Sequence, residues 1–384
     1  MAVTSVATAV PLRLRWLQLL DHRIGPALCR MAPRPGRTGT DGAPLPSAQV
    51  RRVLVIRPGG LGDAVLLRPA LAALSRAWPD AAVDVLAERR NVAGLRIGAA
   101  PCATLLYDES PAATLRQLRR RRYDLVIDTE QYHCFPALLA RLLSPRWICG
   151  FDSLDREALR THPVAHDEGR CEVDCFLDLV NAVTGANAAQ EPGEPFLEAT
   201  AADLAWADGA LMRTAGAPLA VIIPAAGGSF RLWPVERYGE VAVMLLGRGY
   251  RVAIVGGTDA IEAGAAIAAA VGRSPLVIDM TGRTTLAQTA AILARARFAL
   301  GPDSGVLHIA AALGTPTVAL FGPGLWRKWA PRGPRHRLVR LGLPCSPCVA
   351  GGRLPPCPHD VACMRDLASA PVLAAILSLE GSLA

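Results

Sequence analysis

Short apolar runs alternate with amphipathic stretches along most of the chain. The first run, 53–57, ends at a Pro-Gly-Gly turn, and further runs follow at 83–87, 104–108 and 124–128. An apolar run bounded by turn residues is typical of a buried strand, and the stretches between the runs, such as 64–77, have helical length. The alternation predicts βαβ units, in which helices cover both faces of a parallel sheet.

The alternation stops at a polar, less periodic region, 152–198, and then starts again. The second series predicts strands at 221–224, 250–257, 276–280, 298–302 and 317–323. A length of 384 residues also favours two domains over one. The sequence therefore predicts two α/β domains, 51–200 and 201–344, with a boundary near 190–215.

Segments of a different character flank the two domains. Residues 1–50 form an N-terminal amphipathic segment and linker, with a helix predicted at 11–31 and a Pro/Gly/Thr-rich linker at 32–47. This helix either packs on the surface of the first domain or makes a peripheral contact with an anionic membrane. Residues 345–384 form a cysteine-rich segment followed by a C-terminal helix.

Composition narrows the class of protein. Hydrophobic residues make up 51% of the chain and charged residues 19%, which excludes a disordered protein. The formal net charge is +8, which favours anionic partners, but no nucleic-acid-binding motif is present, so we expect no nucleic acid. The sequence has no apolar run long enough to predict a transmembrane helix or a secretory leader. We expect a cytoplasmic protein, with the inner face of the cytoplasmic membrane as a site of peripheral contact.

The loop after the first predicted strand is rich in glycine. Gly59, Gly60 and Gly62 allow a tight turn and a close approach to a ligand, and Asp63 opens the next helix near Arg57. Asp63 either caps that helix or takes a proton from a hydroxyl group. The spacing departs from the G-x-G-x-x-G of dinucleotide-binding enzymes, which argues against a nicotinamide-dependent oxidoreductase.

Two loops of the second domain are suited to a diphosphate. Small residues follow the strand 221–224 and expose backbone N–H groups, and Arg231 supplies a nearby cation. The residues expected to surround the anion here are Gly227, Gly228 and Ser229.

The second of these loops follows the strand 298–302. Asp303, Ser304 and Gly305 form a turn at the start of a helix, whose amino end favours a phosphate. His308 lies on the first turn of that helix and either faces the same ligand or is bonded internally.

Four segments together resemble glycosyltransferase family 9, the heptosyltransferases that build the inner core of lipopolysaccharide. The segments are GGLGDAVLLRPAL, GGSFRLWP, DMTGRTTLAQTAAILARA and GPDSGVLHIAAALGTPTVALFGP, and the resemblance spans residues 53–366. It implies the α/β GT-B fold, two Rossmann-like domains with parallel sheets facing a cleft. It also implies an inverting reaction that needs no metal or other cofactor for catalysis.

The resemblance assigns roles to single residues and to partners. Asp63 matches the catalytic base on the acceptor side, and Arg231 stands where the family usually has a lysine that contacts the donor phosphates. Thr284 matches a position near the adenine. The donor-site motif of the family matches Asp303, Ser304, Gly305 and His308. The implied partners are a nucleotide-sugar donor, usually ADP-heptose, and an anionic glycolipid or other glycan acceptor.

The sequence leaves two alternatives open. The same fold also suits a catalytically inactive regulatory protein that binds a nucleotide sugar, although Asp63 favours an enzyme. In the C-terminal segment, the spacing C-x2-C-x8-C-x5-C predicts a structural zinc or iron, with reduced thiols or disulfides as alternatives. The cysteines concerned are Cys345, Cys348, Cys357 and Cys363.

Overall fold

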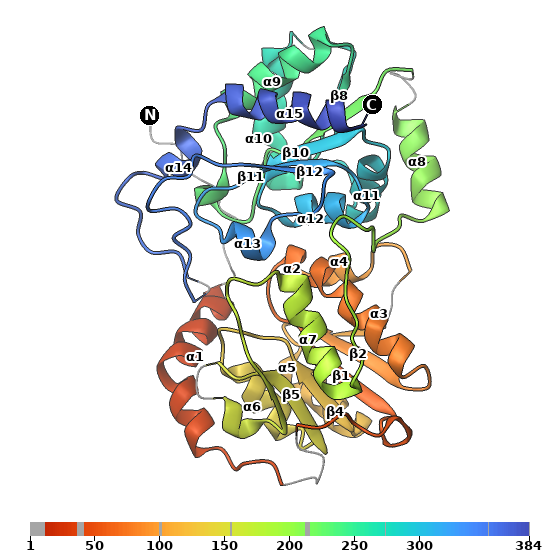
Figure 1. Ribbon diagram of the computed structural model, residues 1–384, viewed down its shortest axis with the longest axis vertical. Coiled ribbons are helices and arrows are strands. Elements are labelled where there is room, and N and C mark those ends of the chain that lie inside the picture. Colours follow the sequence, from red (N-terminus) through yellow and green to blue (C-terminus); the bar gives the residue numbers. More distant parts are fainter. Residues whose placement is uncertain are drawn as a thin grey trace. The chain divides into compact units, whose positions relative to one another are not determined.

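The chain folds into two compact units (Figure 1). The computed structural model describes residues 12–36, 42–99, 102–153, 156–211, 216–272, 274–351 and 353–383. The N-terminal unit extends to Gln190, and the C-terminal unit comprises Glu191–Ala384 together with Arg96–Ala99. Part of the predicted linker, 37–41, lies outside the described residues, as do the side chains of the predicted helix up to residue 18.

The N-terminal unit is built on six parallel strands in the order β3-β2-β1-β4-β5-β6. The strands are β1 (Arg52–Ile56), β2 (Ala82–Ala87), β3 (Ala103–Leu106), β4 (Leu125–Asp128), β5 (Trp147–Phe151) and β6 (His162–Val164). Val53 and Leu54 of β1 and Leu125 and Val126 of β4 are completely buried. These central strands are continuous apolar runs because helices cover both faces of the sheet.

The unit has seven helices in its described residues, of which α1 packs on α6. They are α1 (Leu12–Met31), α2 (Leu61–Leu66), α3 (Arg68–Ala77), α4 (Val92–Leu95), α5 (Pro111–Arg121), α6 (Phe135–Leu142) and α7 (Glu172–Thr184). On one face, Leu118 of α5 and Ala140 of α6 share an apolar core with Leu54 and Ile148 of the strands. The helix α7 packs against α3, β5 and β6.

Two expectations from the sequence need correction in this unit. The predicted helix 64–77 begins at Leu61 and is divided at Leu67, because Pro69 lies in the first turn of α3 and lacks an N–H group. The region 152–198 is more regular than its polarity indicates. It contains β6 and α7, whose Val173, Phe176 and Val180 lie on one buried helix face.

The C-terminal unit repeats the same plan, with the parallel strand order β12-β11-β10-β7-β8-β9. Its strands are β7 (Leu219–Ile222), β8 (Arg251–Ile254), β9 (Val277–Asp279), β10 (Phe298–Pro302), β11 (Thr317–Leu320) and β12 (His336–Val339). Its helices are α8 (Ala201–Leu211), α9 (Val235–Gly247), α10 (Ile261–Ala270), α11 (Leu286–Ala294), α12 (Gly305–Ala312), α13 (Trp326–Trp329), α14 (Ala362–Arg365) and α15 (Ser369–Leu383). Short 3₁₀ turns lie at Ser229–Arg231 and Thr258–Ala260 in this unit, and at Ser47–Gln49 and Glu157–Leu159 in the N-terminal unit.

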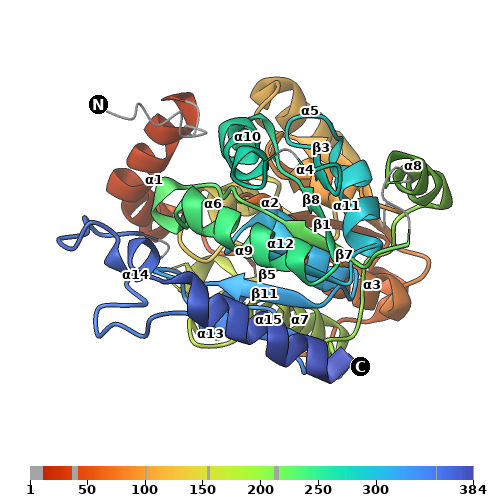
Figure 2. The same cartoon turned by 90° about the horizontal axis from the view of Figure 1, so that it is seen from above.

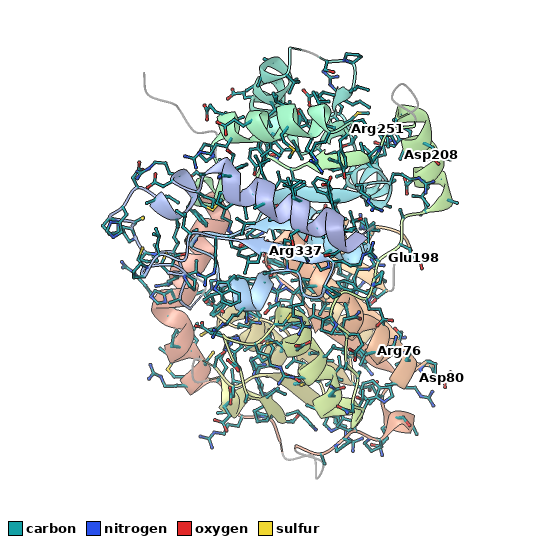
Figure 3. The ribbon with its side chains drawn as sticks, turned by 45° about the horizontal axis from the view of Figure 1, so that its top comes forward. Arg76, Asp80, Glu198, Asp208, Arg251 and Arg337 are labelled. Atoms are coloured by element: carbon teal, nitrogen blue, oxygen red, sulfur yellow. The ribbon has the colours of Figure 1, made fainter. Side chains whose placement is uncertain are left out.

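The C-terminal helix α15 is part of the second unit. It packs against α9 and β12, and its Val372 and Ile376 are completely buried in the apolar core. Arg337 of β12, seen beside α15 in Figure 3, donates hydrogen bonds from Nε to Ser378 Oγ and from Nη2 to Ser382 Oγ. These contacts hold the helix against the edge of the sheet.

Each sheet has a switch point, which is the pair of neighbouring strands at which the chain stops adding strands on one side and continues on the other. Counted within its own unit, each strand order is 3-2-1-4-5-6, so the first and fourth strands are neighbours. These pairs are β1 with β4 and β7 with β10. In open α/β sheets, ligands bind at the carboxyl ends of the two strands that flank this switch point. The loops after β1 and β7 are the glycine-rich loops singled out in the sequence.

Candidate functional site

The carboxylate of Asp63 is held on one side only. Its Oδ2 accepts a hydrogen bond from Gly60 N at 2.8 Å and lies 3.2 Å from Nη2 of Arg57. The capping interpretation is therefore correct for that oxygen. In the described part of the chain neither contact uses Oδ1, and the side chain is 25% exposed. One oxygen anchors the carboxylate while the other is open to a ligand.

Gly59 lets Arg57 and Asp63 meet. Its φ is +120°, a region that residues with a Cβ rarely adopt. A Cβ there would lie 2.9 Å from Arg57 Nη2 and 3.0 Å from Asp63 Oδ2. A side chain at position 59 would therefore push the two charged groups apart.

Arg57 is buried and supported from β4. Its Nη1 donates to the backbone oxygen of Thr129 at 3.1 Å and to Oγ1 of Thr129 at 3.3 Å. Its guanidinium lies 5.0 Å from the ring centre of Phe176. Burial lowers the pKa of Arg57, but the carboxylates of Asp63, Glu172 and Glu130 outweigh burial and raise it. Arg57 is thus a fixed cation beside Asp63.

Glu88, at the end of β2, supports the same loop. Its Oε1 accepts from Gly59 N at 3.4 Å and from the Tyr107 hydroxyl, and its Oε2 pairs with Nε of Arg90. Burial and the neighbouring Glu88 raise the pKa of Tyr107, which stays a hydrogen-bond donor. Sequence reasoning missed both Glu88 and Thr129. Each is a polar residue just after a buried strand, which is the signal that would have identified them.

In the C-terminal unit, Arg231 and Asp303 come together across the switch point. Nε of Arg231 lies 3.5 Å from Oδ2 of Asp303, and its Nη1 donates to the backbone oxygen of Asp303 at 3.3 Å. Phe230 lies beneath the guanidinium, 5.4 Å from ring centre to Cζ. In the described part of the chain, Arg231 Nε and Asp303 Oδ2 are buried without a hydrogen-bond partner. The pair keeps unused hydrogen-bonding capacity at this loop.

His308 completes this group from the other side of Asp303. Its Nε2 lies 3.5 Å from Oδ1 of Asp303, whose side chain is 6% exposed. Burial raises the pKa of Asp303, but Arg231 and His308 together outweigh it, so the pKa lies below its ordinary value. Asp303 is a buried anion that orients two donors.

The remaining donor-site residues line neighbouring turns. Ser304 Oγ accepts from Leu307 N at 3.4 Å and caps α12, which begins at Gly305. Gly227 and Ser229 are exposed, and a Cβ on Gly227 would meet nothing within 4 Å. By contrast, a Cβ on Gly228 would lie 2.4 Å from the ring of Phe230. The turn therefore presents its backbone next to Arg231.

Thr284 stands apart from this group. Its Oγ1 lies 2.8 Å from Oγ1 of Thr289, in the turn between β9 and α11. In the described residues no contact joins it to Arg231, Asp303 or His308. Its predicted place near an adenine stays a prediction.

The four C-terminal cysteines lie near one another, and their metal centre stays a prediction. None of them is in a disulfide, and Cys363 is buried while Cys345 and Cys357 are exposed. Burial, followed by the proximity of the other three thiols, raises the pKa of Cys363. Over the described residues, no group of three or more His, Cys, Asp or Glu side chains is placed to hold a metal ion. The arrangement therefore shows neighbouring thiols without metal geometry.

The family model for glycosyltransferase family 9 (heptosyltransferase) matches residues 112–356, which is more than half of the chain. The two Rossmann-like units, each with a charged group at its switch point, are those of a GT-B glycosyltransferase. The chain belongs to glycosyltransferase family 9.

Curated relatives include lipopolysaccharide heptosyltransferases of several bacteria. The heptosyltransferase 3 of Escherichia coli is 27% identical over 297 residues, 70% of this chain and 84% of the relative. The heptosyltransferase 1 of Pseudomonas aeruginosa is 29% identical over 321 residues, 78% and 86% of the two chains. The heptosyltransferase 2 of Salmonella typhimurium is 35% identical over 116 residues, but these span only 30% of this chain and 33% of the relative.

Solved structures show the same fold. The E. coli ADP-heptose lps heptosyltransferase II superposes with a TM-score of 0.69 at 23% identity, covering 87% of this chain and all of that one. E. coli heptosyltransferase WaaC with ADP-2-deoxy-2-fluoro heptose has a TM-score of 0.62 at 20% identity, with 85% and 99% covered. The iron-containing dodecameric glycosyltransferase TibC of E. coli reaches 0.57 at 16% identity, with 88% and 77% covered.

Proposed function

We propose that this protein transfers a heptose, or a related sugar, from ADP-heptose to a hydroxyl group of a lipopolysaccharide-core-type or other glycan acceptor. The family supports transfer of a glycosyl group, and the relatives named above supply the donor and the kind of acceptor. We further propose that the reaction inverts the anomeric carbon and uses no metal for catalysis. The unbridged C-terminal cysteines support a reducing, cytoplasmic location.

On the acceptor side, Asp63 is the proposed general base. Its open Oδ1 takes the proton of the acceptor hydroxyl as that oxygen attacks C1 of the sugar. The bond from C1 to the diphosphate oxygen breaks, and its electron pair leaves with the nucleoside diphosphate. Arg57 and Gly60 hold the carboxylate by Oδ2 throughout, so its orientation does not depend on the substrate.

On the donor side, Arg231 is the proposed contact for the leaving diphosphate. A guanidinium that is partly exposed, next to the amino end of α12, stabilises negative charge as it develops on the phosphates. Asp303 contacts Arg231 directly, and His308 contacts Asp303 in turn. Arginine replaces the lysine expected here, and its planar donors suit a phosphate equally well.

One observation carries this proposal. Each sheet has a charged side chain shortly after its first strand, Asp63 in the first turn of α2 and Arg231 in the turn after β7, at the switch point where ligands bind in open α/β sheets. The first is a carboxylate with one oxygen outside its two contacts, and the second is a partly exposed guanidinium. A base for a hydroxyl and a cation for a diphosphate are the two groups that direct displacement at a sugar requires.

The test is transfer from ADP-heptose to a truncated lipopolysaccharide core, with product detected by mass spectrometry. We expect Asp63→Asn to lower kcat by about 100- to 10,000-fold, as loss of a general base does, and to leave ADP affinity nearly unchanged. Asp80→Asn, an exposed aspartate of the same unit (Figure 3), is the matched control. Retained turnover in Asp63→Asn would remove Asp63 as the base. Binding of ADP-heptose without transfer to any glycan would favour the inactive regulatory protein.

The donor contact is tested by calorimetry with ADP. We expect Arg231→Gln to weaken ADP binding by about 10- to 100-fold, the effect of losing charged hydrogen bonds to a phosphate, and Arg231→Lys to retain most of it. Arg248→Gln, at the far end of α9, is the control. Equal affinities for all four proteins would contradict the assignment.

We also propose that the cysteine segment closes around a structural zinc or iron. The mutual proximity of the four thiols supports this, and the lack of metal geometry in the described residues speaks against it. Elemental analysis of the purified protein decides the question, with about one metal per chain expected. No catalytic step depends on it.

A further inference from the structure

A buried carboxylate of the helix α1, that of Asp21, binds the N-terminal unit. Asp21 Oδ2 accepts from Cys134 N at 3.0 Å and lies 3.2 Å from Nδ1 of His133, while Oδ1 accepts from Phe135 N at 2.5 Å. Phe135 is the first residue of α6, so Asp21 satisfies N–H groups at the positive end of that helix. Figures 1 and 2 show α1 on the outside of its unit, beside α6.

The inner face of α1 continues from Asp21 in steps of four residues. A Cβ on Gly25 would lie 2.7 Å from the Cβ of Cys134, so the helices approach closely at this glycine. Cys29 is buried in an apolar cluster with Cys134 and Leu159. After the helix, Arg141 Nε donates to the backbone oxygen of Pro33 at 2.7 Å. These contacts fix which face of α1 points away from the protein.

The outward face carries a stripe of apolar side chains. Leu20, Ile24, Ala27 and Met31 follow each other at intervals of four, three and four residues, which places them in one row along a helix. We call this row the α1 stripe. Leu20 and Ile24 are each 45% exposed and Met31 is 74% exposed. Together with Leu19, α1 holds four of the twelve exposed large apolar side chains of the described residues.

The polar groups beside the α1 stripe are cationic. Arg23 and Arg30 are exposed, and each directly precedes a residue of the stripe in the sequence, Ile24 or Met31. The only acidic residue in the sequence of α1 is Asp21, which is turned inward and buried. Over the described residues, no helix is long and apolar enough to cross a membrane. An exposed apolar row with cations beside it is typical of a helix that lies in the plane of a membrane surface.

We propose that the α1 stripe rests in the interface of an anionic bilayer, with Arg23 and Arg30 directed to the lipid phosphates. A second copy of the chain is a poorer occupant, because each copy carries a net charge of +8 and presents arginines along the same edge. An anionic surface complements both the stripe and its cations. The proposal rests on the proposed function only in placing the enzyme where a glycolipid acceptor resides.

The test is sedimentation of the full-length protein with vesicles. We expect binding to vesicles of phosphatidylcholine with added phosphatidylglycerol, weak binding to phosphatidylcholine alone, and loss of binding as salt rises. The double variant Ile24→Ser, Met31→Ser should bind at least about tenfold more weakly, because two apolar side chains no longer leave water. Val243→Ser with Leu377→Ser, exposed apolar residues of α9 and α15, is the matched control and should bind as the wild type does.

Melting temperature and transfer to a soluble acceptor are measured on the same variants. Both should be unchanged, since the substituted side chains are exposed and distant in sequence from Asp63, so loss of binding is not loss of folding or of activity. Equal vesicle binding by the wild type and the stripe variant would overturn the proposal. So would light scattering that shows a dimer in the wild type and a monomer in the variant, which would assign the stripe to a second copy.

Discussion

Asp63 and Asp303 are the same residue type in two different environments. Asp63 has two donors on one oxygen and leaves the other open, whereas Asp303 is enclosed between Arg231 and His308. A half-open carboxylate is able to accept a proton, and an enclosed one holds cations in place. Position in the chain does not distinguish them, because both follow the first or fourth strand of a sheet.

At the residue scale, we predict that Arg57 positions Asp63. Arg57→Met should lower kcat about 10- to 100-fold with little change in the KM for the donor, because the carboxylate loses one of its two anchors. Arg57→Lys should recover part of the rate. An unchanged kcat in Arg57→Met, together with a lower melting temperature, would mean that Arg57 serves folding alone.

Among the elements, the outermost strand of the second sheet shows what local patterns miss. The strand β12 has the sequence HRLV, which has no apolar run, and only Val339 is buried. It forms because its backbone pairs with β11 and α15 packs over it. Its His336 Nδ1 lies 2.9 Å from Oγ1 of Thr317, its register partner. Burial, together with Arg335 and Arg337, lowers the pKa of His336 to about 4.

We predict that His336 makes the second unit sensitive to mild acid. Between its ordinary pKa of 6.5 and about 4, the unfolded chain binds a proton that the folded chain does not, so this part of the stability is intact above pH 6.5 and falls as pH is lowered. The loss reaches about 3 kcal/mol at most. Denaturant unfolding at neutral and mildly acid pH should show a smaller loss for His336→Asn than for the wild type. An exposed histidine variant, His22→Asn, should behave as the wild type, and identical losses in all three would contradict the prediction.

Considered as a whole molecule, the chain has two units with one topology and different chemistry. Each has its own sheet and its own charged loop. The proposed place of the diphosphate is the C-terminal unit, because Arg231 is partly exposed there, whereas Arg57 of the other loop is buried beside Asp63. We therefore propose that nucleotide binding belongs to the C-terminal unit by itself. This assignment needs no knowledge of the acceptor.

We predict that ADP protects only the C-terminal loops from hydrogen exchange. Backbone N–H groups at 224–231 and 303–308 should exchange more slowly when ADP is bound, because they line the proposed phosphate contact. The loop 57–63 should be unaffected, and UDP and GDP should protect less than ADP. Protection at 57–63 with none at 303–308 would reverse the assignment of the two units.

The sequence by itself determined the fold class, the two series of strands and most of the loops that carry charge. Apolar runs and glycine-rich turns are local signals, so 53–57, 221–224 and 298–302 stand out without any tertiary information. The family followed from the same loops. The strands β6 and β12 escaped because they are short and lack an apolar run, and the helix α7 escaped because the region around it is polar.

Only the tertiary structure decided which charged groups meet. The strand order 3-2-1-4-5-6 places β4 beside β1, and this brings Thr129 to Arg57 across 72 residues. The same order brings Asp303 to Arg231. Strand order depends on the packing of helices on both faces of the sheet, which no local pattern records. For that reason the charged residues were predictable as single groups, and their pairing was not.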